Sequence, residues 1–254
     1  MGRLVRAEVV TRYVFNFRMS PAEAAAMLPV PWLEPAIVDG SAILSFCPYV
    51  LRRLTVGRLP AWLGLDSICA AYRLAVVEDT PDGPRPAVWV PGRSSSSAIV
   101  AWGARRWIHT PRFDRISEPR SRRPGVLEYV RPGAAPFRAV LGSEEHSPGC
   151  GSHAFAGERE FGCFMDAGTS SLAPGRRAGE LVRIDLDLRG TRWAALPVVE
   201  VVDELVPEGA AFESAFVGRG GTYTWWLAGD MPVGRRATQV PQALVPSTTR
   251  SGPK

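Results

Sequence analysis

The feature that most limits the fold of this chain is an alternation of apolar and polar side chains at every second position. Between residues 4 and 18, one face carries mainly valine, alanine, tyrosine and phenylalanine, whereas the other carries mainly arginine, glutamate and asparagine. Residues 181–189 alternate in the same way. A period of two is typical of a β-strand with one buried face. The alternation therefore predicts strands that each cover a hydrophobic core on one side.

The rest of the chain predicts further strands, separated by turns that contain glycine and proline. Ser20, Pro21 and Glu23 have the spacing of a capping box, which predicts a short helix that ends at Pro29. A hairpin with its turn at residues 82–83 is expected between strands at 66–77 and 87–90. Within residues 36–50, a turn at 39–40 is expected ahead of a buried strand around 43–46. Other strands are expected at 126–130, 137–141, 211–217 and 222–228, a loop at 52–58, and helix or strand at 158–164 and 197–206.

These elements show no β-α-β order, so they predict a mainly β (α+β) fold with an antiparallel sheet and two or three helices packed on it. We expect a single domain over residues 1–235. Residues 236–254 are rich in proline, arginine, threonine and serine, which predicts a flexible C-terminal tail.

The formal charge of +5 comes almost entirely from arginine, because the only lysine is Lys254. The arginines are spread along the chain, so nucleic-acid binding is not expected. No buried lysine is available to form a Schiff base. The chain has no apolar run of about 18 residues and its first residues lack the apolar segment of a signal peptide, so we expect no membrane span and a cytoplasmic location. The sequence does not decide between a monomer and a homo-oligomer.

The residues that commonly carry chemistry form few recognisable patterns. The four cysteines have no CxxC spacing, which favours free thiols in a reducing compartment. His146, Cys150, His153 and Cys163 match no standard zinc spacing, so no metal and no other cofactor is expected. No serine lies in a G-x-S-x-G motif, so a serine triad is unsupported. The glycine-rich residues 218–221 precede a strand, which predicts a hairpin turn rather than a phosphate-binding loop.

Residues 93–115, RSSSSAIVAWGARRWIHTPRFDR, are the strongest candidate for a pocket wall. A predicted amphipathic helix of about three turns begins at Ser94, with four serines at its start. Their hydroxyls and the free backbone N–H groups could bind an anionic or carbonyl-bearing ligand, or one serine could cap the helix while the others are solvated. Trp89, Trp102 and Trp107 could line a pocket or belong to the core. Either Arg105 or Arg106 should point into the sheet, with Asp66 as a reasonable partner.

Several segments of this sequence resemble an uncharacterised bacterial family of the acetoacetate decarboxylase-like superfamily. They are DSICAAY at 66–72, VWV at 88–90 and ARRWIHTPRF at 104–113, together with the SPAEAAAMLP helix and the LEPAIVDGSAILSF segment. The resemblance covers about residues 5–230. It implies a closed or cone-shaped antiparallel sheet around a central pocket.

The resemblance also implies where a reaction would take place. In the decarboxylases an arginine and an aromatic residue lead to a proline and then to the Schiff-base lysine. Arg105 and the proline match here, whereas the lysine position falls on Arg112 and the pocket glutamate position on Asp66. Because a guanidinium cannot form an imine, the lysine-dependent mechanism is not expected.

We therefore expect a cofactor-independent enzyme that acts on a small carbonyl-containing substrate by acid–base and electrostatic catalysis. A cyclisation, dehydration or isomerisation in bacterial secondary metabolism, such as antibiotic biosynthesis, would suit such a site. The expected roles are Asp66 as general base, His109 as general acid and Arg112 as oxyanion clamp. The residues expected to bind substrate are Arg105, Trp89, Trp107, Ser94 and Tyr72. The alternative is a non-catalytic protein that binds a small molecule in the same pocket.

Overall fold

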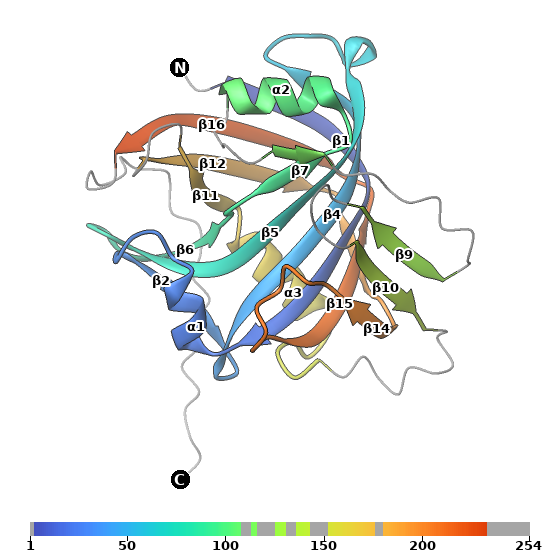
Figure 1. Cartoon of the computed structure of the whole chain (residues 1–254). Coiled ribbons are helices and arrows are strands. Elements are labelled where there is room, and N and C mark those ends of the chain that lie inside the picture. The colour runs from blue at the N-terminus through green and yellow to red at the C-terminus, as the bar shows by residue number, and fades with distance from the viewer. Residues whose placement is uncertain are drawn as a thin grey trace.

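The computed structural model (Figure 1) describes residues 3–107, 113–115, 125–130, 136–142, 152–175 and 180–232. In these ranges the helices are α1 (Pro21–Ala26), α2 (Ala98–Trp107), α3 (Glu158–Ala167) and a 3-10 turn, η1 (Ala61–Leu63). The strands are β1 (Arg3–Met19), β2 (Leu33–Pro35), β3 (Ile37–Val38), β4 (Ser41–Val56), β5 (Leu65–Thr80), β6 (Gly83–Trp89), β7 (Arg93–Ser95), β8 (Phe113–Arg115), β9 (Val126–Tyr129), β10 (Phe137–Leu141), β11 (Ser170–Pro174), β12 (Glu180–Arg189), β13 (Arg192–Ala195), β14 (Val198–Val202), β15 (Ala211–Arg219) and β16 (Thr222–Pro232). The prediction of a mainly β fold is confirmed.

Seven strands form a closed barrel. Neighbouring strands pair in the order β1, β16, β12, β11, β6, β5 and β4, and β4 pairs again with β1 to close the ring. The sheet is not wholly antiparallel as predicted, because β11 pairs parallel with β6. About 80 residues separate these two strands, which is ample length for the crossover that a parallel pair requires. A closed sheet leaves its seven strands without free edges and encloses an interior that side chains or a ligand can fill.

The strand β1 pairs with three strands because it is long and irregular. Its first half pairs with β16 and its second half with β15 along one edge, while β4 follows its other edge. The glycine-rich residues 218–221 are therefore not the predicted hairpin turn. They form the junction between β15 and β16, and Gly220 and Gly221 have positive φ values of 69° and 113°. Their backbone pairs with Val9 and Val10 of β1, so the junction continues along one edge.

The helices cover different parts of the barrel. As predicted, α1 starts with a capping box, in which the Ser20 hydroxyl accepts from the Glu23 N–H and the Glu23 carboxylate accepts from the Ser20 N–H. Figure 1 shows α2 lying across one end of the barrel. The helix α3 packs its Phe161 and Met165 against Ile43 and Cys47 of β4 in a common hydrophobic cluster.

Two hydrophobic clusters lie on the outer face of the barrel strands. One joins β1, β4 and β5 to the separate three-stranded sheet of β14, β10 and β9, with Phe15, Phe46 and Phe137 at its centre. The other lies under α1 and β2 and includes Leu44, Leu74 and Trp89. Among the described helices, none is long and apolar enough to cross a membrane.

Candidate small-molecule binding site

Two neighbouring cavities lie inside the barrel. The smaller has a volume of about 30 Å³ and the larger about 230 Å³. The smaller is lined from six of the seven barrel strands, which places it in the interior. Tyr49, Arg93 and Trp225 line both cavities, so the two adjoin each other at these side chains.

The larger cavity is bounded by the inner face of the barrel and by α2. Its lining consists mainly of aliphatic and aromatic side chains from β1, β4, β5, β12, β16 and α2. Arg93 and several residues of α2 contribute, so the expectation that residues 93–115 line a pocket agrees with the structure over this part of the segment. A mostly apolar concave site with a few convergent polar groups is the usual form of a small-molecule site.

The polar groups of the site include two guanidinium groups, from Arg12 and Arg93. Arg12 is 3% exposed. Its Nη1 donates a long hydrogen bond of 3.4 Å to the Tyr223 hydroxyl, and its Nε has no hydrogen-bond partner among the described residues. Arg93 is half-buried and its Nη2 lies 3.4 Å from the Ser171 hydroxyl, while its buried Nε has no hydrogen-bond partner in the described part of the chain. Arg93 also shares a hydrogen bond with the Tyr49 side chain, and Arg12 with the Cys47 side chain, so the described hydrogen-bond partners of both groups are hydroxyl and thiol groups.

Aromatic rings provide part of the environment of Arg12. Its guanidinium carbon lies 5.8 Å from the ring centres of both Trp193 and Tyr223, within the range of a cation–π interaction. Burial lowers the pKa of Arg12, but Tyr223 and Cys47 outweigh this and raise the pKa above its ordinary value. Arg12 is therefore charged at any pH at which the protein is folded.

The neighbours of Arg93 are neutral at physiological pH. Burial lowers the pKa of Arg93, partly offset by Tyr49 and Cys69. Burial also raises the pKa of the Tyr49 hydroxyl and of the Cys69 thiol, so both keep their protons. Arg93 thus has dipoles around it but no counter-charge from these two side chains.

No carboxylate balances either arginine within the described part of the chain. The residues that line the two cavities include no aspartate or glutamate. Arg73 also lines the smaller cavity, and it donates to the carbonyl oxygen of Gly168 at the C-terminus of α3, where a cation is favourable. By contrast, the buried Arg183 pairs with the Glu78 carboxylate at 2.5 Å. A buried charge without an opposite charge is costly, so Arg12 and Arg93 favour an anionic ligand.

Three of the predicted site residues lie away from these cavities. Asp66 is exposed, and its carboxylate accepts a hydrogen bond from the Arg53 N–H at 3.0 Å. Tyr72 packs against Phe46 in the outer cluster, and its hydroxyl donates to Asp203. Trp89 is 4% exposed and belongs to the outer cluster under α1. Tyr72 and Trp89 therefore pack in the outer hydrophobic clusters, and Asp66 does not line either cavity.

The serine segment differs from the prediction. The helix α2 begins at Ala98, not at Ser94, because residues 93–95 form β7 and pair with β5. Ser97 alone caps the helix, since its hydroxyl accepts from the Val100 N–H. Ser95 and Ser96 bond to residues of β5 instead. Ser94 is half-buried in β7 and does not line either cavity.

The remaining predicted residues belong to α2 and the segment after it. Arg105 is exposed on α2. Trp107 is the last residue of α2, but its side chain lies outside the described atoms, and His109 and Arg112 lie outside the described residues. Their expected roles remain predictions. Of the four residues weighed as zinc ligands, His153 and Cys163 are exposed, and no group of three possible metal ligands occurs in the described ranges.

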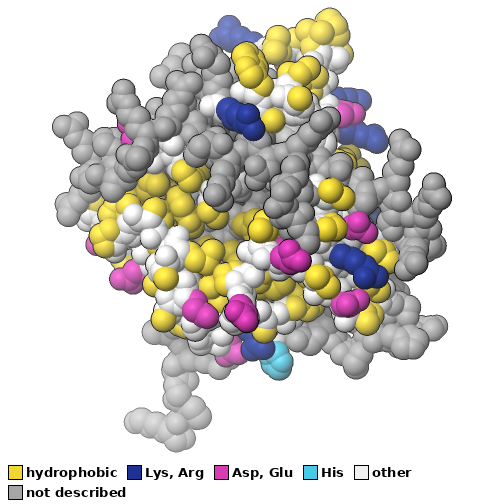
Figure 2. All heavy atoms as spheres, viewed as in Figure 1, with side chains coloured by type: hydrophobic (Ala, Val, Ile, Leu, Met, Phe, Trp, Pro, Cys, Tyr) yellow, Lys and Arg dark blue, Asp and Glu magenta, His cyan; other side chains and the backbone are white. Residues whose placement is uncertain are grey.

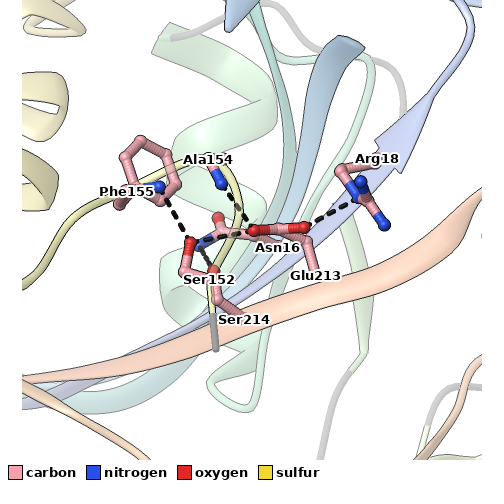
Figure 3. A network of polar contacts seen from close by, with 7 residues as sticks. All are labelled: Asn16, Arg18, Ser152, Ala154, Phe155, Glu213 and Ser214. Carbon is pink, nitrogen blue, oxygen red and sulfur yellow. Dashed lines mark hydrogen bonds and ion pairs between the residues drawn. The ribbon is translucent and has the colours of Figure 1, made fainter. Parts of the chain in front are cut away.

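A second polar network is formed by residues that do not line the two cavities (Figure 3). The buried Glu213 carboxylate accepts hydrogen bonds from the Ser152 hydroxyl and the Ala154 N–H, both at 2.8 Å, and forms an ion pair with Arg18 at 2.7 Å. Asn16 donates to Ser214 beside it. These groups satisfy one another, so we read the network as an anchor for the segment before α3 rather than as a catalytic group.

Sequence reasoning missed Arg12, Tyr49 and Tyr223. Arg12 lies on the face of β1 that its alternation marks as solvent-exposed, but that face lines the barrel, and Asn16 on it is fully buried. The available signal was the length of β1. A strand of 17 residues in a chain of this size can be covered on both sides.

The family model described as DUF2071, "Uncharacterized conserved protein", matches residues 7–148, more than half of the 254 residues. The chain belongs to this family. Among curated proteins, none matches the sequence significantly. The matched part of this DUF2071 protein runs from β1 to just beyond β10 and includes Arg12, Tyr49, Arg93 and α2.

Solved structures show which fold this DUF2071 chain shares. An acetoacetate decarboxylase-like enzyme from Sphingomonas wittichii RW1 matches with a TM-score of 0.52 and 13% identity, over 91% of this chain and 92% of that one. The enduracididine biosynthesis enzyme MppR, complexed with pyruvate, matches with a TM-score of 0.52 and 13% identity, over 92% and 91%. Acetoacetate decarboxylase from Legionella pneumophila matches with a TM-score of 0.54 and 12% identity, over 88% and 87%. The predicted acetoacetate decarboxylase-like fold is confirmed.

Proposed function

We propose that this protein binds a small organic acid inside the barrel and is an enzyme that acts on a carbonyl group of that acid. The observation that carries the proposal is the pair of guanidinium groups, Arg12 and Arg93, which line one interior site with no carboxylate beside them in the described part of the chain. Charge-assisted hydrogen bonds from arginine to a carboxylate are strong and directional. MppR, which shares the fold, is a biosynthetic enzyme that binds the oxo acid pyruvate.

The chemistry that these groups favour is electrostatic. A reaction that passes through an enolate, such as an isomerisation, a dehydration or a cyclisation, develops negative charge on the carbonyl oxygen. Fixed positive groups in a water-poor site stabilise that charge more than they stabilise the substrate. The protonated Tyr49 hydroxyl adds a neutral donor. We propose His109 as the group that moves the proton and Arg112 as a further anion-binding group. No imine is proposed, since the chain's only lysine is Lys254.

A second candidate function is binding without turnover. It is favoured by the lining of the two cavities, where no carboxylate or imidazole that could accept a proton from carbon lies among the described residues. The two functions share the same anion site. They differ in whether a proton leaves the carbon next to the carbonyl group.

One pair of measurements on pyruvate tests both candidates. Calorimetric titration should show that Arg12→Gln and Arg93→Gln each weaken pyruvate binding by roughly tenfold to a hundredfold. Arg52→Gln, an exposed arginine on the same strand as Tyr49, is the matched control and should bind as wild type. If both variants bind pyruvate like wild type, the anion site is wrong.

The second measurement follows proton exchange. Pyruvate is incubated with the protein in D₂O, and methyl deuteration is followed by NMR against a protein-free sample. Exchange that is faster than this background supports the enzyme. Binding with only background exchange supports the non-catalytic candidate.

A further inference from the structure

We infer that the ligand is an amphipathic acid, whose hydrocarbon body lies in the larger cavity beneath α2 while its carboxylate lies at Arg93 and Arg12. This inference rests on the proposed function, because the same two arginines hold the carboxylate. It adds the chemical class of the rest of the molecule, which the arginines alone leave open.

The size of the larger cavity is the first argument. Its volume is about 230 Å³, whereas the cavity lined by both Arg12 and Arg93 has only about 30 Å³, room for about two waters. An engineered protein cavity of about 150 Å³ admits benzene. The space beneath α2 therefore holds a ring or an alkyl chain in addition to a carboxylate.

The chemistry of the lining is the second argument. Tyr49 and Arg93 supply polar atoms where the two cavities meet, and Cys69 supplies a thiol in the larger one. Apart from these three, only Thr55 and two indole groups among the lining side chains carry a polar atom. Water in such a space would find few hydrogen-bond partners. A hydrocarbon group satisfies this surface and is stabilised by leaving water.

The mouth of the cavity is the third argument. Four lining side chains are at least half exposed: Leu59 at 55%, Leu63 at 50%, Ile99 at 64% and Trp102 at 65%. Figure 2 shows hydrophobic side chains gathered over α2 and the loop beside it. Clustered exposed apolar side chains indicate a site that another apolar group covers. Because these four side chains also line the cavity, we expect the end of the ligand's hydrocarbon body to cover them from inside the cavity.

Polarity along the cavity then fixes the direction of binding. The charged end faces Arg93 and Arg12 in the barrel, and the apolar end faces the mouth between η1 and α2. The reverse direction would place a carboxylate among leucine, isoleucine and tryptophan and leave both arginines unmatched, which is costly for each charge.

A chain-length series tests the inference. The sodium salts of propanoate, hexanoate, octanoate and decanoate are titrated into the whole protein by calorimetry. Affinity should rise by about fourfold for each methylene that enters the cavity and level off once the chain reaches the mouth. Trp102→Ala, at an exposed position that should not disturb folding, is expected to weaken decanoate binding at least threefold and leave propanoate binding unchanged. Ala104→Leu places a larger side chain in the cavity from α2, so the increase in affinity with chain length should be smaller than in the wild type.

The outcomes separate this inference from the proposed function. If pyruvate and propanoate bind through Arg12 and Arg93 but affinity does not rise with chain length, the amphipathic ligand is wrong while the anion site stands. If 1-octanol binds as tightly as octanoate, or Arg12→Gln leaves octanoate binding unchanged, the carboxylate end is wrong and the proposed function fails with it. If affinity rises with chain length in Trp102→Ala as it does in the wild type, the ligand does not contact Trp102 at the mouth of the cavity.

Discussion

Replacing Arg12 with methionine should separate the stability of the free protein from its ability to bind an acid. Arg12 is 3% exposed, donates a long hydrogen bond to the Tyr223 hydroxyl and shares another with the Cys47 thiol, whose pKa burial raises, so the thiol keeps its proton at pH 7. Methionine keeps an unbranched side chain and removes the charge. In the ligand-free protein, Arg12→Met is therefore expected to raise the free energy of unfolding.

The magnitude follows from opposing contributions. Removing a charge from water costs several kcal/mol even after relaxation. The two cation–π contacts return about 1 kcal/mol each, and the 3.4 Å hydrogen bond less than about 1 kcal/mol. The net gain expected for Arg12→Met is about 1–2 kcal/mol. At about 3 °C per kcal/mol for a domain of this size, Tm should rise by about 3–6 °C.

The matched control is Arg183→Met. Arg183 is as deeply buried as Arg12, but it pairs with the Glu78 carboxylate. Its removal leaves Glu78 buried without a counter-charge and should lower the free energy of unfolding by about 3–5 kcal/mol. The assay is urea unfolding of protein that has been refolded from denaturant, so that no bound acid remains. A loss of 3 kcal/mol or more in Arg12→Met, comparable to the control, would show that the charge of Arg12 is balanced in the ligand-free protein.

Three further predictions concern the barrel and its anchors. Glu213→Gln should lower the free energy of unfolding by about 2–3 kcal/mol, because the carboxylate accepts two hydrogen bonds and forms an ion pair. It should also speed proteolytic cleavage near residue 152. Unchanged cleavage would show that Glu213 does not anchor the segment before α3. Cys163 is exposed and should be alkylated in the native protein, whereas Cys47 and Cys69, buried thiols whose pKa burial raises, should react only on unfolding, as peptide mass spectrometry would show. Gly221→Ala should cost about 1–3 kcal/mol in thermal unfolding, because φ is 113° and the new Cβ would lie 2.8 Å from a backbone oxygen; a neutral effect would argue against the junction geometry.

Local patterns in the sequence predicted most of the elements. The alternation at residues 4–18 and 181–189 corresponds to β1 and β12, and the capping box corresponds to α1. These signals depend only on neighbouring residues. The expected loop at 52–58 is instead mostly the end of β4, because a register shift between Leu51 and Leu54 lets two exposed arginines remain in the strand.

The candidate site was harder to predict, because closure of the sheet decides which face of a strand lies inside. Tyr72 and Trp89 are on barrel strands as expected, but they face outward, whereas the neighbouring Ala71 and Val90 line the smaller cavity. The polar face of β1, which alternation assigns to solvent, carries Arg12 into the interior. A period of two reports that two faces differ, not which one is enclosed.

The segment at residues 93–115 shows both outcomes in one place. The sequence predicted a helix that helps to line a pocket, and α2 does line the larger cavity. It did not predict β7, because four serines before a helix are typical of an N-cap. Pairing of residues 93–95 with β5 fixes the backbone of Arg93 at the point where the two cavities meet. Only the tertiary pairing shows this.

A crystal structure of the protein with octanoate tests the binding site most directly. The carboxylate oxygens are expected to lie within hydrogen-bond distance of the Arg93 or Arg12 guanidinium group, with the alkyl chain beneath α2 and its end near Trp102. A carboxylate at the mouth with the chain pointing inward, or octanoate bound only outside the barrel, would contradict this binding mode.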